Sequence, residues 1–286
     1  MNVVNPEPEN KISFKRKIIY FVIFCICLIA IFFAVYAQFF FGQSIKNIFK
    51  IKNKERITTE YTESKEEFDK IFDNTLEQNE KKDYEQLKID KEKPIVYTNY
   101  KYEENIEGKY NIKVNLPYIN IENDTIKMYN KEIKEIFEDK TTSILKSNAV
   151  GEIYNVYYKV YITDGILSII IKSNLKEGSN PQRQIYKTYN FDLEKMTEIN
   201  IYDLLSKKEI QENDANSTIQ TEIKKIQSDV EKLRKSGYEI YERDSNQDIY
   251  KIKNVNNFFI GKDSKIFIIF AYGNQNFTSE KDIIIL

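Results

Sequence analysis

Residues Glu152 to Thr163 read EIYNVYYKVYIT, and this stretch decides the fold. Apolar side chains recur at every second position along it, which is the period of a β-strand with one buried face. Asp164-Gly165 follows, a dipeptide typical of a two-residue hairpin turn, and ILSIIIKSNL then predicts the return strand. We therefore predict an antiparallel hairpin. Its first strand places five side chains in the core: Tyr154, Val156, Tyr158, Val160 and Ile162.

The other face of the same strand carries two candidate binding residues, Tyr157 and Tyr161, on either side of Lys159. Two tyrosine rings flanking a lysine can stack on a sugar ring. The alternative is structural, since tyrosine favours strands and pairs with side chains on neighbouring strands.

Outward from the hairpin, strands and helices occur in runs and do not alternate one by one. Upstream, we predict strands at 95–97 and 110–114 and a helix from Asn123 or Asp124 to about Ser147, because its apolar residues share one helical face. Downstream, we predict a third hairpin strand over 184–193 and helices at 201–205 and 207–235. Further strands are predicted at 238–243, 248–253 and 265–272. This order predicts an α+β fold, an antiparallel sheet or sheets with helices packed on one face, divided into lobes 94–148 and 149–286.

The segment Ile18 to Phe41 contains no charged residue and is long enough, at roughly 36 Å as a helix, to cross a bilayer. We predict a transmembrane helix at 18–41, preceded by a short cytoplasmic stub at 1–17. The alternative is a cleaved signal peptide. Lys15, Arg16 and Lys17 directly flank the span and favour a cytoplasmic N-terminus with an exported C-terminal domain. Residues 42–93 are charged and poor in apolar side chains, so we expect a linker or stalk there.

The composition excludes several kinds of chemistry. The chain has no His, and its two cysteines, Cys25 and Cys27, both lie in the apolar run. A histidine base, a histidine-ligated metal and a cysteine nucleophile in the exported part are thereby excluded, and we expect no cofactor and no metal. The sequence contains no Gly-rich loop that would bind a phosphate group. Beyond the membrane-proximal stretch it is not basic enough to bind nucleic acid, so we expect no nucleic-acid partner.

The stretch YKTYNFDLEKMTEINIYDLL, Tyr186 to Leu205, resembles a segment of a family of bacterial envelope ectodomains. In that family a strand ending in N-F-D-L precedes a short turn and a helix start, and KVNLPYINIENDTIKMYNKEI, Lys113 to Ile133, is similar to its small companion domain. The family includes lysozyme-sensing anti-sigma-V factors and the non-catalytic N-terminal modules of some peptidoglycan deacetylases. The resemblance implies an exported α+β domain. Neither an anti-sigma region nor a catalytic domain is evident in this sequence.

The expected function is that of a single-pass, non-enzymatic membrane protein whose exported domain binds a cell-envelope component or a secreted protein. The alternatives are a cell-wall enzyme that uses carboxylates, or a structural subunit of a membrane complex. The loop from Lys176 to Arg183 is a further candidate binding site, because Asn180, Gln182 and Arg183 offer neutral donors and one fixed cation. The alternative for this loop is a plain polar hairpin connection.

Overall fold

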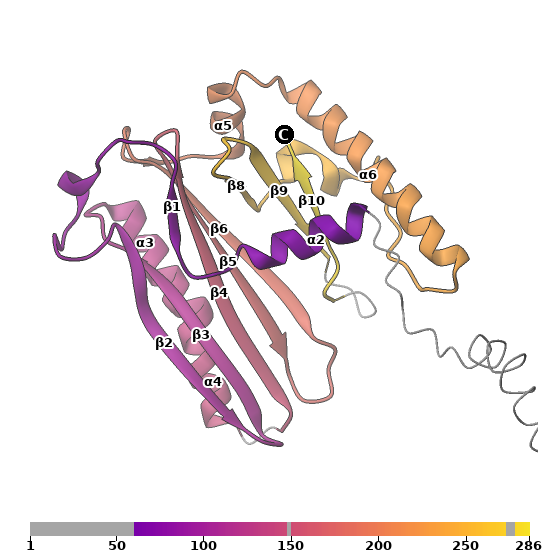
Figure 1. Ribbon diagram of the computed structural model, residues 1–286, viewed down its shortest axis with the longest axis horizontal. Helices are drawn as coiled ribbons and strands as arrows, with labels where there is room; N and C mark the ends of the chain where they lie inside the picture. The colour runs from indigo at the N-terminus through magenta and orange to yellow at the C-terminus, as the bar shows by residue number, and fades with distance from the viewer. Residues whose placement is uncertain (1–59, 148–149, 273–277) are drawn as a thin grey trace, which may run out of the picture. The chain divides into compact units, whose positions relative to one another are not determined.

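The structure, a computed structural model, describes residues 60–147, 150–272 and 278–286 (Figure 1). The predicted stub at 1–17 and the predicted transmembrane helix at 18–41 lie outside these residues. So does the first part of the predicted linker, up to residue 59. All of the described residues fall in one compact unit.

A seven-stranded mixed sheet is the larger of two sheets and has β4 (Glu152–Thr163) at its centre. Along its whole length β4 pairs antiparallel with β5 (Ile166–Lys176). Its other edge is shared by two parallel neighbours, β3 (Tyr110–Ile119) over the first half and β1 (Leu76–Gln78) over the second half. β2 (Val96–Ile106) pairs with β3, β6 (Arg183–Asp192) pairs with β5, and β7 (Thr197–Glu198) pairs with β6, all antiparallel.

The hairpin predicted from the sequence is confirmed. Asp164 and Gly165 both have positive φ angles, 54° and 76°, which is the backbone conformation that a tight two-residue hairpin turn requires. The five predicted core residues of β4 are buried in the main hydrophobic core. The register places Val160 opposite Ile169, so alternate residues of both strands face the same side.

One face of this sheet is covered by a helix in three continuous parts. These are α3 (Asp124–Ile133), a π-helical turn η2 (Lys134–Glu138) and α4 (Asp139–Lys146). Asn123 begins the helix, because its side-chain oxygen accepts hydrogen bonds from the backbone N–H groups of Thr125 and Ile126. The buried face of this helix contributes Ile126, Tyr129, Ile133, Phe137 and Ile144 to the main core.

The other face of the seven-stranded sheet is partly covered by a small antiparallel sheet, in the order β10-β9-β8. Its strands are β8 (Phe258–Ile260), β9 (Ile266–Ala271) and β10 (Lys281–Ile285). One face of the small sheet packs against α5 (Ile201–Lys207) and α6 (Glu212–Lys235). Its other face packs, through Phe259 and Ile269, against Tyr161, Ile170 and Tyr186 of the large sheet. The fold is α+β with mixed and antiparallel sheets, and its helices are not confined to one face.

The structure differs from the expected linker at 60–93. α2 (Glu60–Lys70) packs Phe68 between the two sheets, β1 joins the large sheet, and Tyr84, just before a single 3-10 turn η1 (Glu85–Leu87), lies in the main core. The few apolar residues of this segment are buried because their partners come from distant strands. The expected boundary at 148/149 falls between β3 and β4, which pair within one sheet and share one core.

Two predicted strands are wrong. Residues 238–243 form no strand, and residues 248–253 fall in the two 3-10 turns η3 (Asp248–Tyr250) and η4 (Ile252–Asn254). Tyr250 and Ile252 are both buried, so side chains two residues apart share a core without a strand between them. That spacing imitates the alternation of a strand.

Candidate functional site

Three residues on the outward face of β4 lie in three different environments. The two predicted binding residues are therefore not part of one site. Tyr157 lines a polar cavity, whereas Tyr161 lines a separate apolar pocket. Between them Lys159 is only 1% exposed. The two tyrosines therefore do not form one sugar-stacking surface.

The polar cavity has a volume of about 330 Å³ and lies over the ends of β2, β3 and β4. On this face the register places Glu103, Lys113 and Asn155 side by side on three adjacent strands. The row continues through Asn174 of β5 to Gln184 of β6. The lining residues include Glu103, Glu104, Asn105, Asn111, Lys113, Asn155 and Tyr157.

Two side-chain oxygens in this row have no hydrogen-bond partner among the residues that the structure describes. Asn155 and Asn174 lie directly opposite each other on β4 and β5, and the Oδ1 atom of each is buried. A buried polar atom without a partner costs about 1–3 kcal/mol, and most such atoms in proteins are paired. The paired asparagines therefore carry two unsatisfied acceptors, of which the Asn155 oxygen belongs to a residue that lines the cavity.

The charged residues of the cavity are already engaged. The Lys113 ammonium lies 3.1 Å from a Glu103 oxygen. The Glu104 carboxylate accepts hydrogen bonds from the hydroxyls of Tyr102 and Tyr110, and these bonds hold the pKa of Glu104 below its usual value. The hydrogen bond to Glu104, followed by desolvation of the phenol, raises the pKa of Tyr102 to about 12. Because residues adjacent in a strand point to opposite faces, Glu103 and Glu104 do not form an acid–base pair.

Lys159 is covered by the segment that follows α2. Its Nζ atom lies 2.5 Å from Glu77 Oε1 and 3.2 Å from Asp73 Oδ1, and it donates to Thr75 Oγ1 at 2.8 Å. All three acceptors belong to residues predicted to be part of a linker. This buried ammonium with three partners serves the fold and is not accessible to a ligand.

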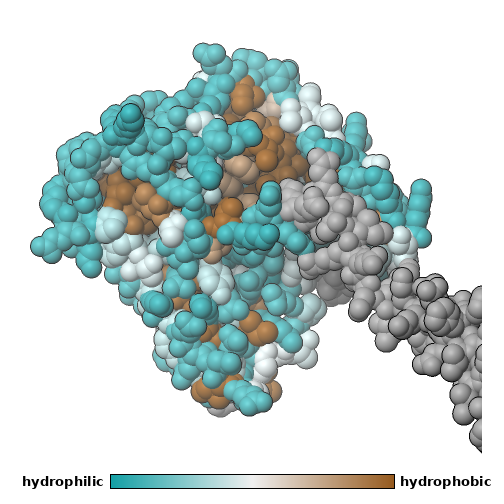
Figure 2. Space-filling model, viewed as in Figure 1, coloured by the Kyte–Doolittle hydropathy of each residue, from teal (hydrophilic) through white to brown (hydrophobic). Residues whose placement is uncertain are grey.

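The apolar pocket lies between α2, β4 and the small sheet and has a volume of about 270 Å³. Tyr161, Phe259 and Phe267 form a run of nearly parallel rings in its wall, with centroid separations of 5.8 and 4.8 Å. Burial raises the pKa of the Tyr161 phenol above its ordinary value. Figure 2 shows an apolar area, in brown, on the part of the surface over the small sheet. Ile285 of β10, which lines the pocket, is 43% exposed.

The predicted binding loop lines neither cavity. Asn180, Gln182 and Arg183 are exposed at the β5–β6 connection, as predicted, but Arg183 pairs with Glu177 at 2.5 Å. Lys140 pairs with the same carboxylate at 2.6 Å. The Gln182 carbonyl accepts a hydrogen bond from the Ser279 hydroxyl at 2.7 Å. These interactions hold the β5–β6 connection against its neighbours. Of the three candidates, Asn180 and Gln182 have side chains without a hydrogen-bonding partner among the residues that the structure describes.

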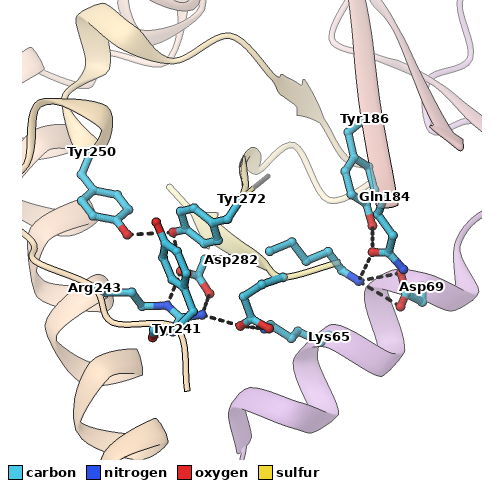
Figure 3. Close-up of polar contacts among 11 residues, drawn as sticks. Lys65, Asp69, Gln184, Tyr186, Tyr241, Arg243, Tyr250, Tyr272 and Asp282 are labelled. Carbon is cyan, nitrogen blue, oxygen red and sulfur yellow. Dashed lines mark hydrogen bonds and ion pairs between the residues drawn. The ribbon is translucent and has the colours of Figure 1, made fainter. Parts of the chain in front are cut away.

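A buried polar network, shown in Figure 3, joins α2, Tyr272 directly after β9, Asp282 of β10 and the segment after α6. The Arg243 and Asp282 side chains are fully buried and are joined by hydrogen bonds of 2.6 and 2.9 Å. The Tyr272 hydroxyl donates to Asp282, and Tyr241 stacks on the Tyr272 ring with centroids 4.1 Å apart. This cluster has its own internal partners and no access to solvent at its centre, so it holds the fold together.

The part of the chain that the structure describes has neither a metal-binding cluster nor a membrane-spanning helix. Over 60–147, 150–272 and 278–286, no three acidic, histidine or cysteine side chains group in a way that could hold a metal ion. Within the same ranges no helix has the length and apolar character needed to cross a membrane.

The asparagine pair was only partly visible in the sequence. Alternation along β4 places Asn155 on the outward face beside Tyr157. Asn174 is on the expected return strand, but its position opposite Asn155 depends on the hairpin register. Only a turn of two residues at Asp164-Gly165 produces that register.

No protein-family model matches the chain, and no curated protein matches it. The solved structures that are similar to it include two of DUF3298 family proteins. The one from Pseudomonas aeruginosa PAO1 is 10% identical, with a TM-score of 0.40 over 66% of this chain and 86% of that chain. The one from Bacteroides fragilis NCTC 9343 is 14% identical, with a TM-score of 0.29 over 62% of this chain and 80% of that chain. Likeness at this level establishes neither a family nor an activity for this chain.

Proposed function

We propose that this chain is a single-pass membrane protein whose exported α+β domain binds a neutral, hydroxyl-rich component of the cell envelope, such as a glycan. The ligand lies in the polar cavity beside Tyr157, and no reaction is catalysed. The observation that carries the proposal is the unpartnered Oδ1 atom of Asn155, which lines this cavity, together with that of Asn174, which lies opposite Asn155 on β5.

The chemistry of the cavity favours a neutral ligand over an ionic one. Lys113 and Glu103 neutralise each other, and Glu104 is held by two phenols. A sugar ring offers hydroxyl donors to the Asn155 and Asn174 oxygens and a flat face to the Tyr157 ring. A phosphate polymer would instead require cations without partners at this position.

The same residues lack the arrangement that catalysis of glycan cleavage requires. The carboxylates that line the polar cavity point to opposite faces of β2, and each has a partner. A glycosidase needs two carboxyl groups on either side of one bond. The chain also has no histidine to serve as an alternative base.

The test is binding of soluble N-acetylglucosamine oligomers by the full-length chain in detergent, measured by calorimetry. Tyr157→Ala and Asn155→Ala are each expected to weaken binding about tenfold, the loss of one ring contact or one hydrogen bond to a buried group. Tyr202→Ala is the matched control, because Tyr202 is 44% exposed on α5 and lines neither cavity. Equal affinity in all four proteins would refute the cavity as the site.

Anchoring and orientation need their own test, because Ile18 to Phe41 lies outside the described residues. We expect protease added to intact protoplasts to digest the domain from residue 60 onward, and carbonate washing to leave the chain in the membrane. A protected domain would reverse the orientation. A mature chain lacking residues 18–41 would show a cleaved signal peptide.

A structural subunit of a membrane complex is the second candidate function, and the apolar pocket favours it. Phe267, Ile283 and Ile285 leave apolar surface exposed at the small sheet. Ile285→Lys would disrupt a protein contact there while leaving glycan binding at the polar cavity unchanged. Loss of a co-purifying membrane protein in this variant would support the structural role.

A further inference from the structure

The edge strand β2 presents an unpaired backbone along one side of the large sheet. Among the residues that the structure describes, β3 is its only strand partner. An irregularity lies between Thr98 and Tyr100, and the ladder is regular from Tyr100 to Ile106. Free strand edges of this length are ready to pair with another strand unless something covers or disrupts them.

The sequence of β2 limits how it can pair with itself. In an antiparallel pair, directly opposite side chains lie on the same face, so even-numbered residues must meet even-numbered ones. Tyr100 and Tyr102 pack against the core, whereas Lys101 and Glu103 lie on the polar face and are exposed. In a symmetric pair of β2 strands, the residue at the twofold axis must therefore lie opposite the same residue of the second copy.

Charge then favours one register, because among the axes near the centre of β2 only one sets opposite charges against each other. An axis through Lys101 or through Glu103 would set each of these residues against its own copy, and directly opposed like charges are destabilising. An axis through Tyr102 sets Lys101 against Glu103 of the second copy, twice by symmetry. Lys101 makes no ion pair with any described residue of its own chain, and Glu103 pairs only with exposed Lys113.

We propose that two copies of this chain associate by antiparallel pairing of their β2 strands, with Tyr102 on the twofold axis and Lys101 opposite Glu103 of the second copy. The two large sheets then become one continuous sheet. Because Glu103 also lines the polar cavity, the cavities of the two copies lie close to the axis on the same face. The pairing does not depend on the identity of any ligand.

One strand pair buries less surface than the roughly 1,200 Å² typical of stable interfaces, so the dimer is expected to be weak in dilute solution. Anchoring both copies in one membrane would raise their effective concentration. The appropriate measurement is thus made on the full-length chain in lipid vesicles.

Disulfide crosslinking tests the register directly, in a full-length chain with Cys25 and Cys27 changed to serine. Tyr102→Cys places a thiol opposite its own copy, within the distance a disulfide needs. Tyr100→Cys is the matched control. Tyr100 lies on the same face of β2 as Tyr102, but in this register position 100 of the second copy is about 13 Å away along the strand. Mild oxidation is expected to crosslink the first variant and not the second on a non-reducing gel.

Charge exchange then tests the contact. In the Tyr102→Cys protein, Lys101→Glu and Glu103→Lys are each expected to lower the crosslinked fraction severalfold, and the two together to restore it, because two opposed ion pairs re-form. Lys224→Glu on exposed α6 makes the same charge change as Lys101→Glu and should have no effect. Crosslinking that is equal at positions 100 and 102, absent at 102, or not restored by the double exchange would overturn the proposal.

Discussion

A single carboxylate, that of Asp69, ties α2 to both sheets. It lies 2.6 Å from the Lys172 ammonium on β5 and 2.9 Å from the Lys281 ammonium on β10 (Figure 3 shows the second contact). Burial pushes the pKa of Asp69 up, but hydrogen bonds from Lys172 and Lys281 outweigh it and hold the pKa below its ordinary value. The folded state therefore favours the ionised form of Asp69.

This depressed pKa predicts a specific acid sensitivity. Asp69 stabilises the fold at any pH above its unfolded pKa of about 3.9, and that stability is lost as pH falls through the lower folded value. Asp69→Asn should unfold at a lower temperature at pH 7, because two largely buried ammonium groups lose their anion. It should also lose less stability than the wild type between about pH 5 and pH 3.

Thermal melts of both proteins at several pH values measure this difference. Glu92→Gln, at an exposed position, is the control for a general change in charge. If the wild type and Asp69→Asn lose the same stability on acidification, the ion pairs of Asp69 do not contribute to the acid transition.

At the scale of elements, local signals predicted some segments well and others not at all. The β4–β5 hairpin follows from alternation and an Asp-Gly turn, and the helix from Asp124 follows from a cap and one apolar face. Both signals lie within the element itself. β8 has only three residues, and its burial depends on contact with the large sheet, which no local pattern records.

The segment from α2 to β1 is also one whose burial cannot be predicted from its own sequence. Its sparse apolar residues indicate a solvated linker when considered alone. Phe68 is nevertheless 6% exposed, because its neighbours Tyr186 and Phe259 come from β6 and β8, more than a hundred residues away. Burial of such a segment is a property of the assembled fold and not of its composition.

Phe68→Ala should therefore cost about 3–5 kcal/mol in the free energy of unfolding, the usual loss for a buried phenylalanine. Ile89→Ala is the matched control, because Ile89 belongs to the same predicted linker and is 50% exposed; its cost should stay below about 0.5 kcal/mol. Denaturant unfolding of both variants gives the comparison. Similar small losses in both would mean that the segment is the linker that its composition suggests.

For the whole domain, the sequence predicted an outward face of β4 but not what covers it. The small sheet and α2 close over Tyr161, and the segment after α2 closes over Lys159. Only the stretch with Asn155 and Tyr157 remains beside a polar cavity. The candidate site was thus predictable as a face of one strand, whereas its extent depends on how the second sheet packs.

The face of the large sheet and the β5–β6 loop are thus alternative binding sites for the glycan. Replacing the loop distinguishes between them. Exchanging residues 178–182 for a short Gly-Ser turn removes the exposed Asn180 and Gln182 side chains. It leaves Tyr157 and both asparagines of the sheet in place. Folding should survive, because changing the length of a surface loop costs little closure entropy, and the hydrogen bonds to the Gln182 carbonyl are exposed to solvent. Glycan affinity measured by calorimetry should then equal that of the wild type. A loss of affinity as large as that of Tyr157→Ala would move the binding site from the sheet to the loop.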